Sequence, residues 1–344
     1  METKMSSSFL DQKVKHVISV KQFDSEFVNL LFNEAREMKK VVMDFKKKII
    51  NQPEMENYTK RWGTKGKGII IFFYEKSTRT IGSFSAAINF LGGSVILTVS
   101  NAKDSSVGKN ESLKDTIRTL AGYLPDAIVL RHSETGAAQK AAEASLEVPI
   151  INAGDGRGEH PTQTLLDIFT MCEVFGIEEF KELDGLKIAI VGDVANSRAA
   201  RSLSFFLGKF YKDVKIYYAS PEPLRVDSDI KDYLSEQGIK FFEVDSLFEL
   251  PSDINVIYQN RNKKDRWQDL GIKINYEEIR DRFAIDKKML SRFSLDTKIM
   301  DPMPRDEQDK EIDPEIDDDP QAIYFPESDN GPFVRMALFK IVFD

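Results

Sequence analysis

The chain has 344 residues, which at about 150 residues per domain is enough for roughly two domains. Its 48 Lys and Arg residues against 56 Asp and Glu residues give a net charge of −8, which argues against a nucleic-acid-binding protein. A single cysteine, Cys172, excludes an internal disulfide framework and a cysteine zinc cluster, and three histidines argue against a histidine-rich metal site. With no apolar run near 18 residues and no signal-peptide core, we expect a cytoplasmic protein without membrane or nucleic-acid partners.

Short apolar runs rich in β-branched residues alternate with helical patterns along the chain. Continuous runs of this kind are typical of strands that are buried on both faces. The predicted strands are Gly68–Phe73, Ser94–Thr98, Ala127–Leu130, Pro149–Asn152, Lys187–Val191, Val214–Tyr218, Lys240–Glu243, Val256–Tyr258 and Lys298–Met300. The predicted helices are Thr80–Leu91, Ser112–Tyr123, Gly136–Ser145, Pro161–Phe175, Ser197–Lys209, Asp229–Gln237 and Gly331–Val342, and Phe9–Val20 is expected to form a short arm or helix.

This alternation predicts an α/β protein with two doubly wound parallel-sheet domains. The first domain is expected to comprise residues 1–160 and 325–344, and the second residues 161–324. The helix Pro161–Phe175 bridges them, and the C-terminal helix returns to the first domain. Ligands of such sheets bind beyond the carboxyl ends of the strands, so the segments after each strand carry the functional information.

The first such segment runs from Phe72 to Phe84, where Ser77, Thr78, Arg79 and Thr80 open a helix after a strand. Hydroxyls and backbone N–H groups at a helix start suit a phosphate dianion, and Arg79 adds a permanently charged donor. Serine and threonine are also ordinary helix caps, so the residues alone favour anion binding and capping equally.

Arg131 stands at the end of a buried strand, where a charge without a partner is costly. An anionic ligand and an internal salt bridge are both consistent with that position.

A glycine-rich loop leads into His160 and Gln163 at the start of the bridging helix. The positive end of the helix dipole opposes protonation of His160, and a neutral imidazole can donate a hydrogen bond to a carbonyl oxygen. Plain capping of the helix is the alternative for both side chains.

Arg198 follows a strand that ends in Gly-Asp, but the G-x-G-x-x-G spacing of dinucleotide-binding proteins is absent. A solvated or ion-paired arginine is the alternative to a ligand contact.

Six segments occur in one order: S-T-R-T after a strand, SSVGKNESLKDT, VLRH, HPTQ, GD-x4-R and x-P-x-P-R. In that order and spacing the chain resembles the transcarbamoylase family, and within it the aspartate carbamoyltransferases, from about Gly68 to Phe339. The resemblance implies two α/β domains, one for carbamoyl phosphate and one for the acceptor amine. It also implies a homotrimer with active sites between domains and between subunits; whether regulatory subunits bind is left open.

By the same resemblance, Ser77, Thr78, Arg79 and Thr80 hold the phosphate. Arg131, His160 and Thr80 bind the carbamoyl oxygen, and Gln163 faces the carbamoyl NH2. Ser106 and Lys109 match the loop that reaches a neighbouring subunit's site, although the loop reads GKNE where the family commonly has KGE.

The reaction is attack of a neutral amine on carbamoyl phosphate through a tetrahedral oxyanion, with phosphate as the leaving group. Positioned donors supply the catalysis, and two bound substrates supply proximity, so we expect no cofactor, no metal and no protein nucleophile. Arg79, Thr80, Lys109, Arg131 and His160 are the expected catalytic residues.

The acceptor, L-aspartate, requires cations for two carboxylates. The resemblance assigns Arg198 and Arg261 to it, together with Lys109, the backbone carbonyl of Met303, and Pro304 across a cis bond. Ornithine enzymes are less similar, because their S-M-G and H-C-L-P segments are absent.

Three positions depart from the family pattern: Asn260 replaces a threonine, Lys263 a glutamine and Asp301 a histidine. Lys263 adds a cation beside the acceptor, so either aspartate is held by one more charge or the acceptor is another acidic or polar amino acid. A non-catalytic ligand-binding relative is a further alternative.

Glu75, Arg198 and Arg266 match family positions whose ion pairs link the domains on closure. For Arg266, a surface salt bridge is the alternative.

Overall fold

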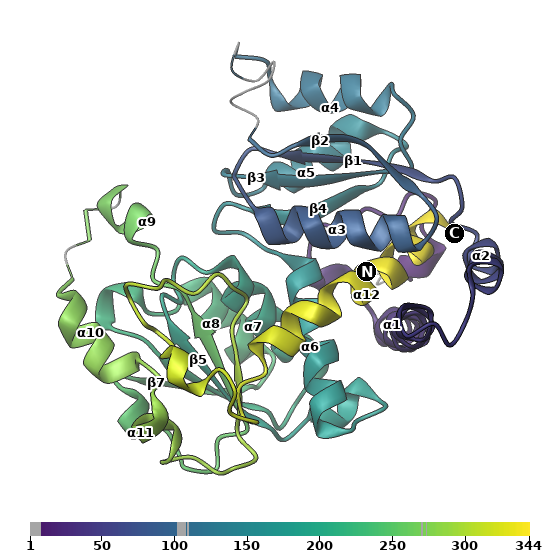
Figure 1. The fold of residues 1–344 in the computed structure, drawn as a ribbon. Coiled ribbons are helices and arrows are strands. Elements are labelled where there is room, and N and C mark those ends of the chain that lie inside the picture. The colour runs from purple at the N-terminus through teal and green to yellow at the C-terminus, as the bar shows by residue number, and fades with distance from the viewer. Residues whose placement is uncertain (1–7, 102–107, 109, 270, 273) are drawn as a thin grey trace, which may run out of the picture. The chain divides into compact units, whose positions relative to one another are not determined.

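The computed structural model describes residues 8–101, 108, 110–269, 271–272 and 274–344, without the side chains of residues 265, 266, 269, 276 and 278. The chain divides into two compact units (Figure 1). Unit 1 comprises residues 1–169 and 330–344, and unit 2 comprises residues 170–329. The boundaries fall inside two helices, α6 (Pro161–Phe175) and α12 (Tyr324–Phe343).

Unit 1 contains a four-stranded parallel sheet in the order β2-β1-β3-β4. Its strands are β1 (Gly68–Phe73), β2 (Ser94–Val99), β3 (Ala127–His132) and β4 (Ile150–Asp155). Its other helices are α1 (Ser25–Lys46), α2 (Gln52–Arg61), α3 (Thr78–Phe90), α4 (Leu113–Ala121) and α5 (Ala137–Ser145). Each parallel connection is made by a helix, as the alternation along the sequence predicts.

Helices cover both faces of the unit 1 sheet, and Figure 1 shows α4 and α3 on opposite sides of it. Ile70, Phe72 and Ile128 share one core cluster with Ile117 of α4 and Ala141 of α5. The intervening residues of β1 point to the other face, because side chains alternate along a strand. All six residues of β1 are buried, which explains its continuous apolar sequence.

The segment before α1 lies along the edge strand β4. The backbone N–H of Val17 donates to Ile150 O (2.8 Å), and Asn152 N–H donates to Val17 O (2.8 Å). Ile150 N–H donates to Nδ1 of His16 (3.1 Å). Short 3-10 turns at Phe9–Asp11 and Val20–Gln22 flank this segment, so the expected arm is confirmed rather than a helix.

Unit 2 contains a five-stranded parallel sheet in the order β7-β6-β5-β8-β9. Its strands are β5 (Lys187–Gly192), β6 (Lys215–Ala219), β7 (Lys240–Val244), β8 (Val256–Asn260) and β9 (Lys298–Met300). Its helices are α7 (Arg198–Phe210), α8 (Ser228–Glu236), α9 (Lys264–Asp269), α10 (Tyr276–Phe283) and α11 (Lys287–Leu290). Ala189, Val191 and Ile257 pack in one cluster with Ile279 and Phe283 of α10, which therefore covers one face of this sheet.

The predicted fold class is confirmed: both sheets are parallel and form α/β units. Every predicted strand is present: Gly68–Phe73 and Lys298–Met300 have the predicted bounds, and the others shift by one to three residues at an end. The C-terminal helix was predicted to begin at Gly331, but it begins at Tyr324 and contains Pro332. In the sequence, the pair Gly331-Pro332 indicates the start of a helix. Pro332 lacks a backbone N–H, and this mostly buried helix tolerates the one missing hydrogen bond. Within the described part of the chain, no helix is both long and apolar enough to cross a membrane.

Candidate functional site

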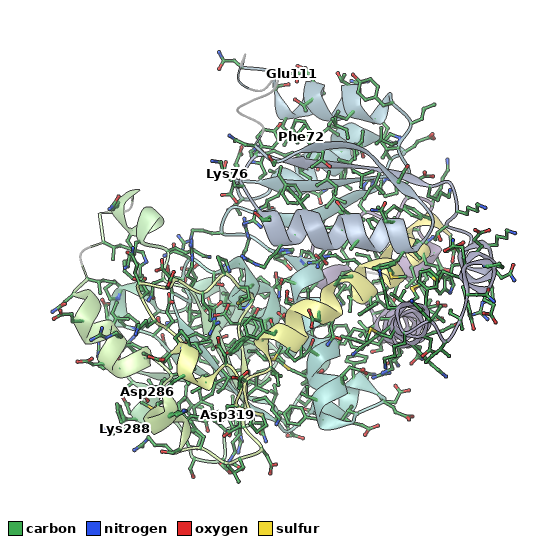
Figure 2. All side chains as sticks on the ribbon, in the orientation of Figure 1. Phe72, Lys76, Glu111, Asp286, Lys288 and Asp319 are labelled. Carbon is green, nitrogen blue, oxygen red and sulfur yellow. The ribbon has the colours of Figure 1, made fainter. Side chains whose placement is uncertain are left out.

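The carboxyl ends of β1, β3 and β4 meet at one edge of the unit 1 sheet. Phe73 of β1 lies beside Arg131 of β3, and His132 of β3 lies opposite Asp155 of β4. The segments that carry the predicted phosphate and carbamoyl contacts follow these strand ends. Lys76, between β1 and α3, lies at this edge (Figure 2).

Helix α3 begins with the S-T-R-T segment. Ser77 is its N-cap residue, but its hydroxyl makes no capping bond and donates instead to Oγ1 of Thr80 (2.9 Å). Thr80 is buried, whereas Thr78 and Arg79 in the first turn are exposed. The N–H groups of this first turn are thus not capped by Ser77, which favours the anion-binding interpretation over simple capping.

Arg131, at the end of β3, forms an ion pair with Glu75. Its Nε lies 3.4 Å from Oε2 of Glu75, and the two side chains are 18% and 27% exposed. The Arg131 carbonyl accepts from Tyr74 N–H (2.8 Å), which fixes the segment that carries Glu75. The internal salt bridge considered from the sequence is therefore present, and it holds the guanidinium at the sheet edge.

The loop after β4 is fixed by Asp155. One oxygen of its carboxylate accepts from Glu159 N–H (2.9 Å), and the other from Gly136 N–H (2.9 Å). Gly156 has a φ of +54°, and a Cβ there would lie 2.6 Å from Thr135 N, so only glycine fits. The buried carboxylate of Glu159 accepts from Ser19 Oγ (2.5 Å) and Val20 N–H (2.9 Å), and burial raises its pKa.

His160 immediately precedes α6, and only 6% of its surface is exposed. Its carbonyl accepts from the N–H groups of Gln163 (3.0 Å) and Thr164 (3.3 Å), so its backbone caps the helix. Its ring Nδ1 lies 3.4 Å from the Thr162 hydroxyl. The imidazole is thereby held at the positive end of the helix dipole.

The side chain of Gln163 forms a hydrogen bond within α6. Its Nε2 donates to Oδ1 of Asp167 (2.8 Å), one turn further along the helix. Asp167 is fully buried and lies in the electrostatic field of Arg335, a buried residue of α12. Sequence reasoning missed both residues, although a carboxylate four positions after Gln163 in an apolar helix was a usable signal.

Two predicted phosphate-loop residues, Ser106 and Lys109, lie outside the described residues. Asn110, next to them, has a φ of +65°. Asparagine is among the few residues that adopt this left-handed conformation readily, which explains how it stands where the family commonly has glycine.

In unit 2, the carboxyl ends of β5, β8 and β9 are neighbours, with Gly192 beside Asn260 and Tyr258 beside Met300. Arg198 is the first residue of α7 and is 8% exposed. Arg261 and Lys263 follow β8 directly. The structure thus places the predicted acceptor-binding residues of this unit at one sheet edge.

Asn260 joins the two central strands of unit 2. Its Nδ2 donates to Val191 O (3.2 Å), and its Oδ1 accepts from the hydroxyl of Ser197 (2.6 Å), the N-cap of α7. The amide of Asn260 thus connects β8 with β5 and with the start of α7.

Lys263 is held by two groups from the β5–α7 loop. Its Nζ donates to Asn196 O, and its N–H donates to Asp193 Oδ2 (3.2 Å). Asp193 is fully buried and also accepts from Trp267 Nε1 (2.8 Å). Asp193 was not among the predicted site residues; its position directly after β5 was the available signal.

Asp301, after β9, is 2% exposed. Its N–H donates to Oε2 of Glu327 (2.9 Å), and its Oδ1 accepts from Met303 N–H (2.5 Å). The Met303–Pro304 bond is cis, as expected, and Met303 has a φ of +55°. Arg266 lies in α9, and its side chain is outside the described part of the structure.

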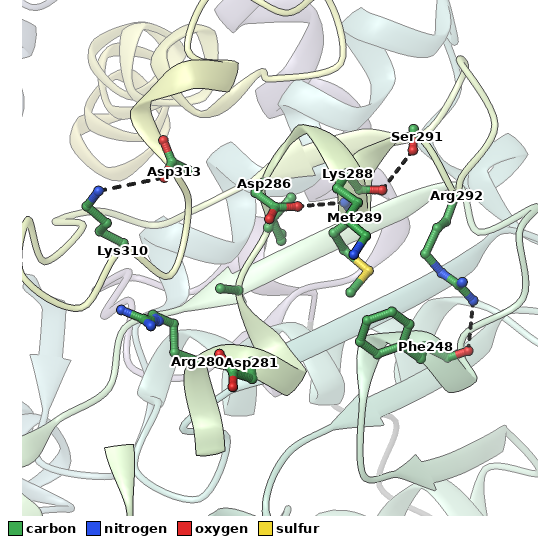
Figure 3. Close-up of a pocket in the computed structure, with 12 residues that line it drawn as sticks. Phe248, Arg280, Asp281, Asp286, Lys288, Met289, Ser291, Arg292, Lys310 and Asp313 are labelled. Atoms are coloured by element: carbon green, nitrogen blue, oxygen red, sulfur yellow. Dashed lines mark hydrogen bonds and ion pairs between the residues drawn. The ribbon is translucent and has the colours of Figure 1, made fainter. Parts of the chain in front are cut away.

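A separate pocket of about 650 Å³ lies in unit 2 and contains none of the predicted site residues (Figure 3). Arg292 lies over the ring of Phe248 at 4.9 Å, and Lys310 pairs with Asp313 at 3.8 Å. The lining is Phe248, Arg280, Asp281, Ala284, Ile285, Asp286, Lys288, Met289, Ser291, Arg292, Lys310 and Asp313.

Among the described residues, no group of three or more acidic, histidine or cysteine side chains is arranged to hold a metal ion.

Two family models match nearly the whole chain. Residues 15–173 match the carbamoyl-phosphate-binding domain of aspartate/ornithine carbamoyltransferases, and residues 184–342 match the aspartate/ornithine-binding domain. The chain is 44% identical over 331 residues to the chloroplastic aspartate carbamoyltransferase of Arabidopsis thaliana, covering 96% of this chain and 78% of that protein.

Solved structures agree with the family models. The catalytic subunit of Methanocaldococcus jannaschii aspartate transcarbamoylase superposes with a TM-score of 0.77 at 42% identity, covering 95% of this chain and 97% of the other. The Trypanosoma cruzi aspartate transcarbamoylase in complex with carbamoyl aspartate and phosphate gives a TM-score of 0.78 at 28% identity, covering 94% and 95%.

Proposed function

The chain belongs to the aspartate/ornithine carbamoyltransferase family, and we propose that it transfers the carbamoyl group of carbamoyl phosphate to the amino group of L-aspartate. The products are N-carbamoyl-L-aspartate and phosphate, and we propose that this step belongs to pyrimidine biosynthesis. We assign carbamoyl phosphate to unit 1 and aspartate to unit 2.

One arrangement supports this function above all others: Arg131 lies near the end of β3, and Thr80 and His160 lie in the segments that follow β1 and β4, all at one sheet edge. In the proposed site these three groups donate to the carbamoyl oxygen. Ser77, Thr78, Arg79 and the first turn of α3 hold the phosphate. Preorganised donors aimed at a developing oxyanion commonly contribute about 3 kcal/mol each.

In the proposed reaction the neutral amino group of aspartate attacks the carbonyl carbon. A C–N bond forms, the carbonyl π electrons move to oxygen, and the three donors stabilise the oxyanion. The oxyanion then collapses, the C–O bond to phosphate breaks, and the departing phosphate accepts the amine proton. Arg79 and Lys109 compensate the charge on that phosphate.

The proposed aspartate contacts are Arg198, Arg261 and Lys263, with Lys109, the Met303 carbonyl and Pro304 completing the acceptor site. Two carboxylates require at least two cations, and arginine binds a carboxylate with two parallel hydrogen bonds. The contacts of Lys263 with Asn196 and Asp193 hold its backbone beside the start of α7, so its charge can add to that of Arg198.

We further propose a homotrimer in which the loop with Ser106 and Lys109 serves a neighbouring subunit's site. A cytoplasmic location is supported by the single buried cysteine, Cys172, which fits a reducing compartment. The chloroplastic relatives make an organelle the alternative.

The test is a ureido-product assay with carbamoyl phosphate and a panel of amines: aspartate, glutamate, asparagine and ornithine. We expect turnover of aspartate above all others. The Lys263→Gln variant removes one cation and should raise KM for aspartate about tenfold with a smaller change in kcat. Turnover of a different amine alone, or a lower KM for aspartate in the variant, would contradict the assignment.

A further inference from the structure

Gln163 is the proposed partner of the carbamoyl NH2, and it can serve only if its carbonyl oxygen, not its NH2 group, faces the substrate. The two ends of a glutamine amide have nearly the same shape, so packing alone selects neither orientation. A group next to Gln163 therefore has to distinguish the NH2 end of its amide, a donor, from the carbonyl end, an acceptor.

Asp167 is that neighbour. It lies one turn further along α6, is fully buried, and accepts from Gln163 Nε2 at 2.8 Å. A carboxylate can only accept, so the amide must direct its NH2 group toward Asp167. Its carbonyl oxygen is then the end that can accept a hydrogen bond from a substrate NH2.

A buried carboxylate is costly unless a positive charge compensates it. Arg335 of α12 is 3% exposed, and burial lowers its pKa to about 10, an effect that the charge of Asp167 opposes. Its guanidinium is therefore still protonated at neutral pH and supplies the positive charge that Asp167 requires.

Arg335 is itself fixed by α3, the helix whose first turn is the proposed phosphate site. Its Nη1 donates to Ser83 Oγ at 2.5 Å, and its guanidinium lies over the ring of Phe84 at 4.7 Å. Gly331, one turn earlier in α12, leaves room for the guanidinium: a Cβ at Gly331 would lie 2.7 Å from Nη1. These contacts join α12 to α3 within unit 1.

We propose that Asp167, with its charge compensated by Arg335, is a positioning residue that fixes the amide of Gln163 so that the enzyme selects a carbamoyl NH2. This inference rests on the proposed function. It adds that the preference for carbamoyl phosphate over the isosteric acetyl phosphate, which has CH3 in place of NH2, depends on Asp167.

The experiment measures dissociation constants of carbamoyl phosphate, acetyl phosphate and inorganic phosphate for the whole enzyme. In Asp167→Asn, the amide at position 167 can donate or accept, so Gln163 can turn either way. With the amide turned the wrong way in about half of the molecules, we expect binding of carbamoyl phosphate to weaken about twofold, with acetyl phosphate and inorganic phosphate unchanged. Equal weakening of all three would indicate a merely structural role and would overturn the proposal.

If Asp167→Asn folds poorly, a second experiment that exchanges the amide and the carboxylate between positions 163 and 167 still tests the proposal. In Gln163→Glu, the carboxylates of residues 163 and 167 face each other. The preference for carbamoyl phosphate over acetyl phosphate should then fall about tenfold. In the double variant Gln163→Glu/Asp167→Asn, the new amide donates to the new carboxylate and the net charge beside Arg335 is unchanged, so most of the preference should return. A double variant as poor as the product of the single variants would overturn the proposal.

Thr164→Val is the matched control. Thr164 is adjacent to Gln163 and fully buried, and its hydroxyl has no hydrogen-bond partner among the described residues. The preference should be unchanged in this variant. A wild-type enzyme that does not bind carbamoyl phosphate would instead refute the proposed function itself.

Discussion

At the scale of single residues, the site depends on charged groups whose partners within the protein hold them in place. Arg131 illustrates this, because its ion pair with Glu75 fixes the guanidinium at the end of β3 before any substrate binds. A fixed donor needs little reorganisation when the oxyanion forms, which is the physical basis of electrostatic catalysis.

Arg131→Ala should therefore lower kcat by about 10² to 10³, because it removes a proposed oxyanion donor. Arg131→Lys should recover only part of the activity, since an ammonium cannot reproduce the planar guanidinium fork. The measurement is kcat at saturating concentrations of both substrates. An alanine variant within threefold of the wild-type kcat would exclude Arg131 from the chemistry.

The positions of Ser77 and His160 at helix starts after strands were predictable from the sequence, and their roles in substrate binding stay predictions. The sequence did not reveal Asp167 and Arg335, because their significance depends on the packing of two helices that lie far apart in the chain. Whether the Ser77 hydroxyl caps α3 could not be predicted either: it donates to Thr80 instead, and anion binding at this helix start stays a prediction.

At the scale of elements, the segment before α1 closes the exposed edge of β4. Its hydrogen bonds with Ile150 and Asn152 satisfy backbone groups that an edge strand would otherwise leave open. The same segment meets the buried carboxylate of Glu159, adjacent to His160. The stability of this segment is thus coupled to the loop that carries a proposed catalytic residue.

His16 makes this contact dependent on pH. Burial lowers its pKa below the usual 6.5, and its neutral Nδ1 accepts from Ile150 N–H. The unfolded chain binds the proton more readily, so the stabilisation is complete above pH 6.5 and is lost as the pH falls through the lowered pKa. The loss should be smaller than about 1.4 kcal/mol per pH unit, because the ring is partly exposed.

The check is urea unfolding at about pH 7.5 and about pH 5.5, on either side of the ordinary histidine pKa, for the wild type and His16→Asn. Asparagine keeps an acceptor oxygen but does not titrate, so the variant should lose less stability at the lower pH. Equal losses in the two proteins would show that His16 does not titrate on unfolding.

Gly331→Ala tests the packing of α12 against α3. The new methyl group would force the buried Arg335 guanidinium away from Ser83, and overpacking of this kind typically costs about 1 to 3 kcal/mol. Chemical denaturation gives the free energy of unfolding. An unchanged value would mean that the guanidinium relaxes without cost.

The elements themselves were largely predictable, because buried parallel strands have continuous apolar sequences that turns interrupt. No helix was predicted for residues 25–61, although α1 has an aspartate cap, Asp24, and buried residues every three or four positions. The start of α12 could not be predicted correctly, because its burial outweighs the helix-breaking character of Pro332.

At the scale of the whole molecule, the proposed trimer has a consequence that single chains cannot show. If each site combines Arg131 of one subunit with Lys109 of a neighbour, a mixture of two inactive variants regenerates some complete sites. Arg131→Ala and Lys109→Ala chains, unfolded and refolded together in equal amounts, should recover about a quarter of the wild-type activity. Recovery of none would contradict shared sites.

The net charge of −8 illustrates what composition conveys at this scale. The negative net charge argued against nucleic-acid binding, but it did not indicate that cations gather at the carboxyl ends of strands in two different sheets. These cations are Arg79, Arg131, Arg198, Arg261 and Lys263. That placement follows from parallel topology, which brings carboxyl ends to one edge of each sheet.

The most direct test of the account combines 13C-labelled carbamoyl phosphate with aspartate and measures the products by mass spectrometry and phosphate release. We predict labelled N-carbamoyl-L-aspartate and phosphate in equal amounts from the wild type, and at least a hundredfold less of both from Arg131→Ala. Phosphate release without labelled carbamoyl aspartate, or equal product from both proteins, would contradict carbamoyl transfer at this site.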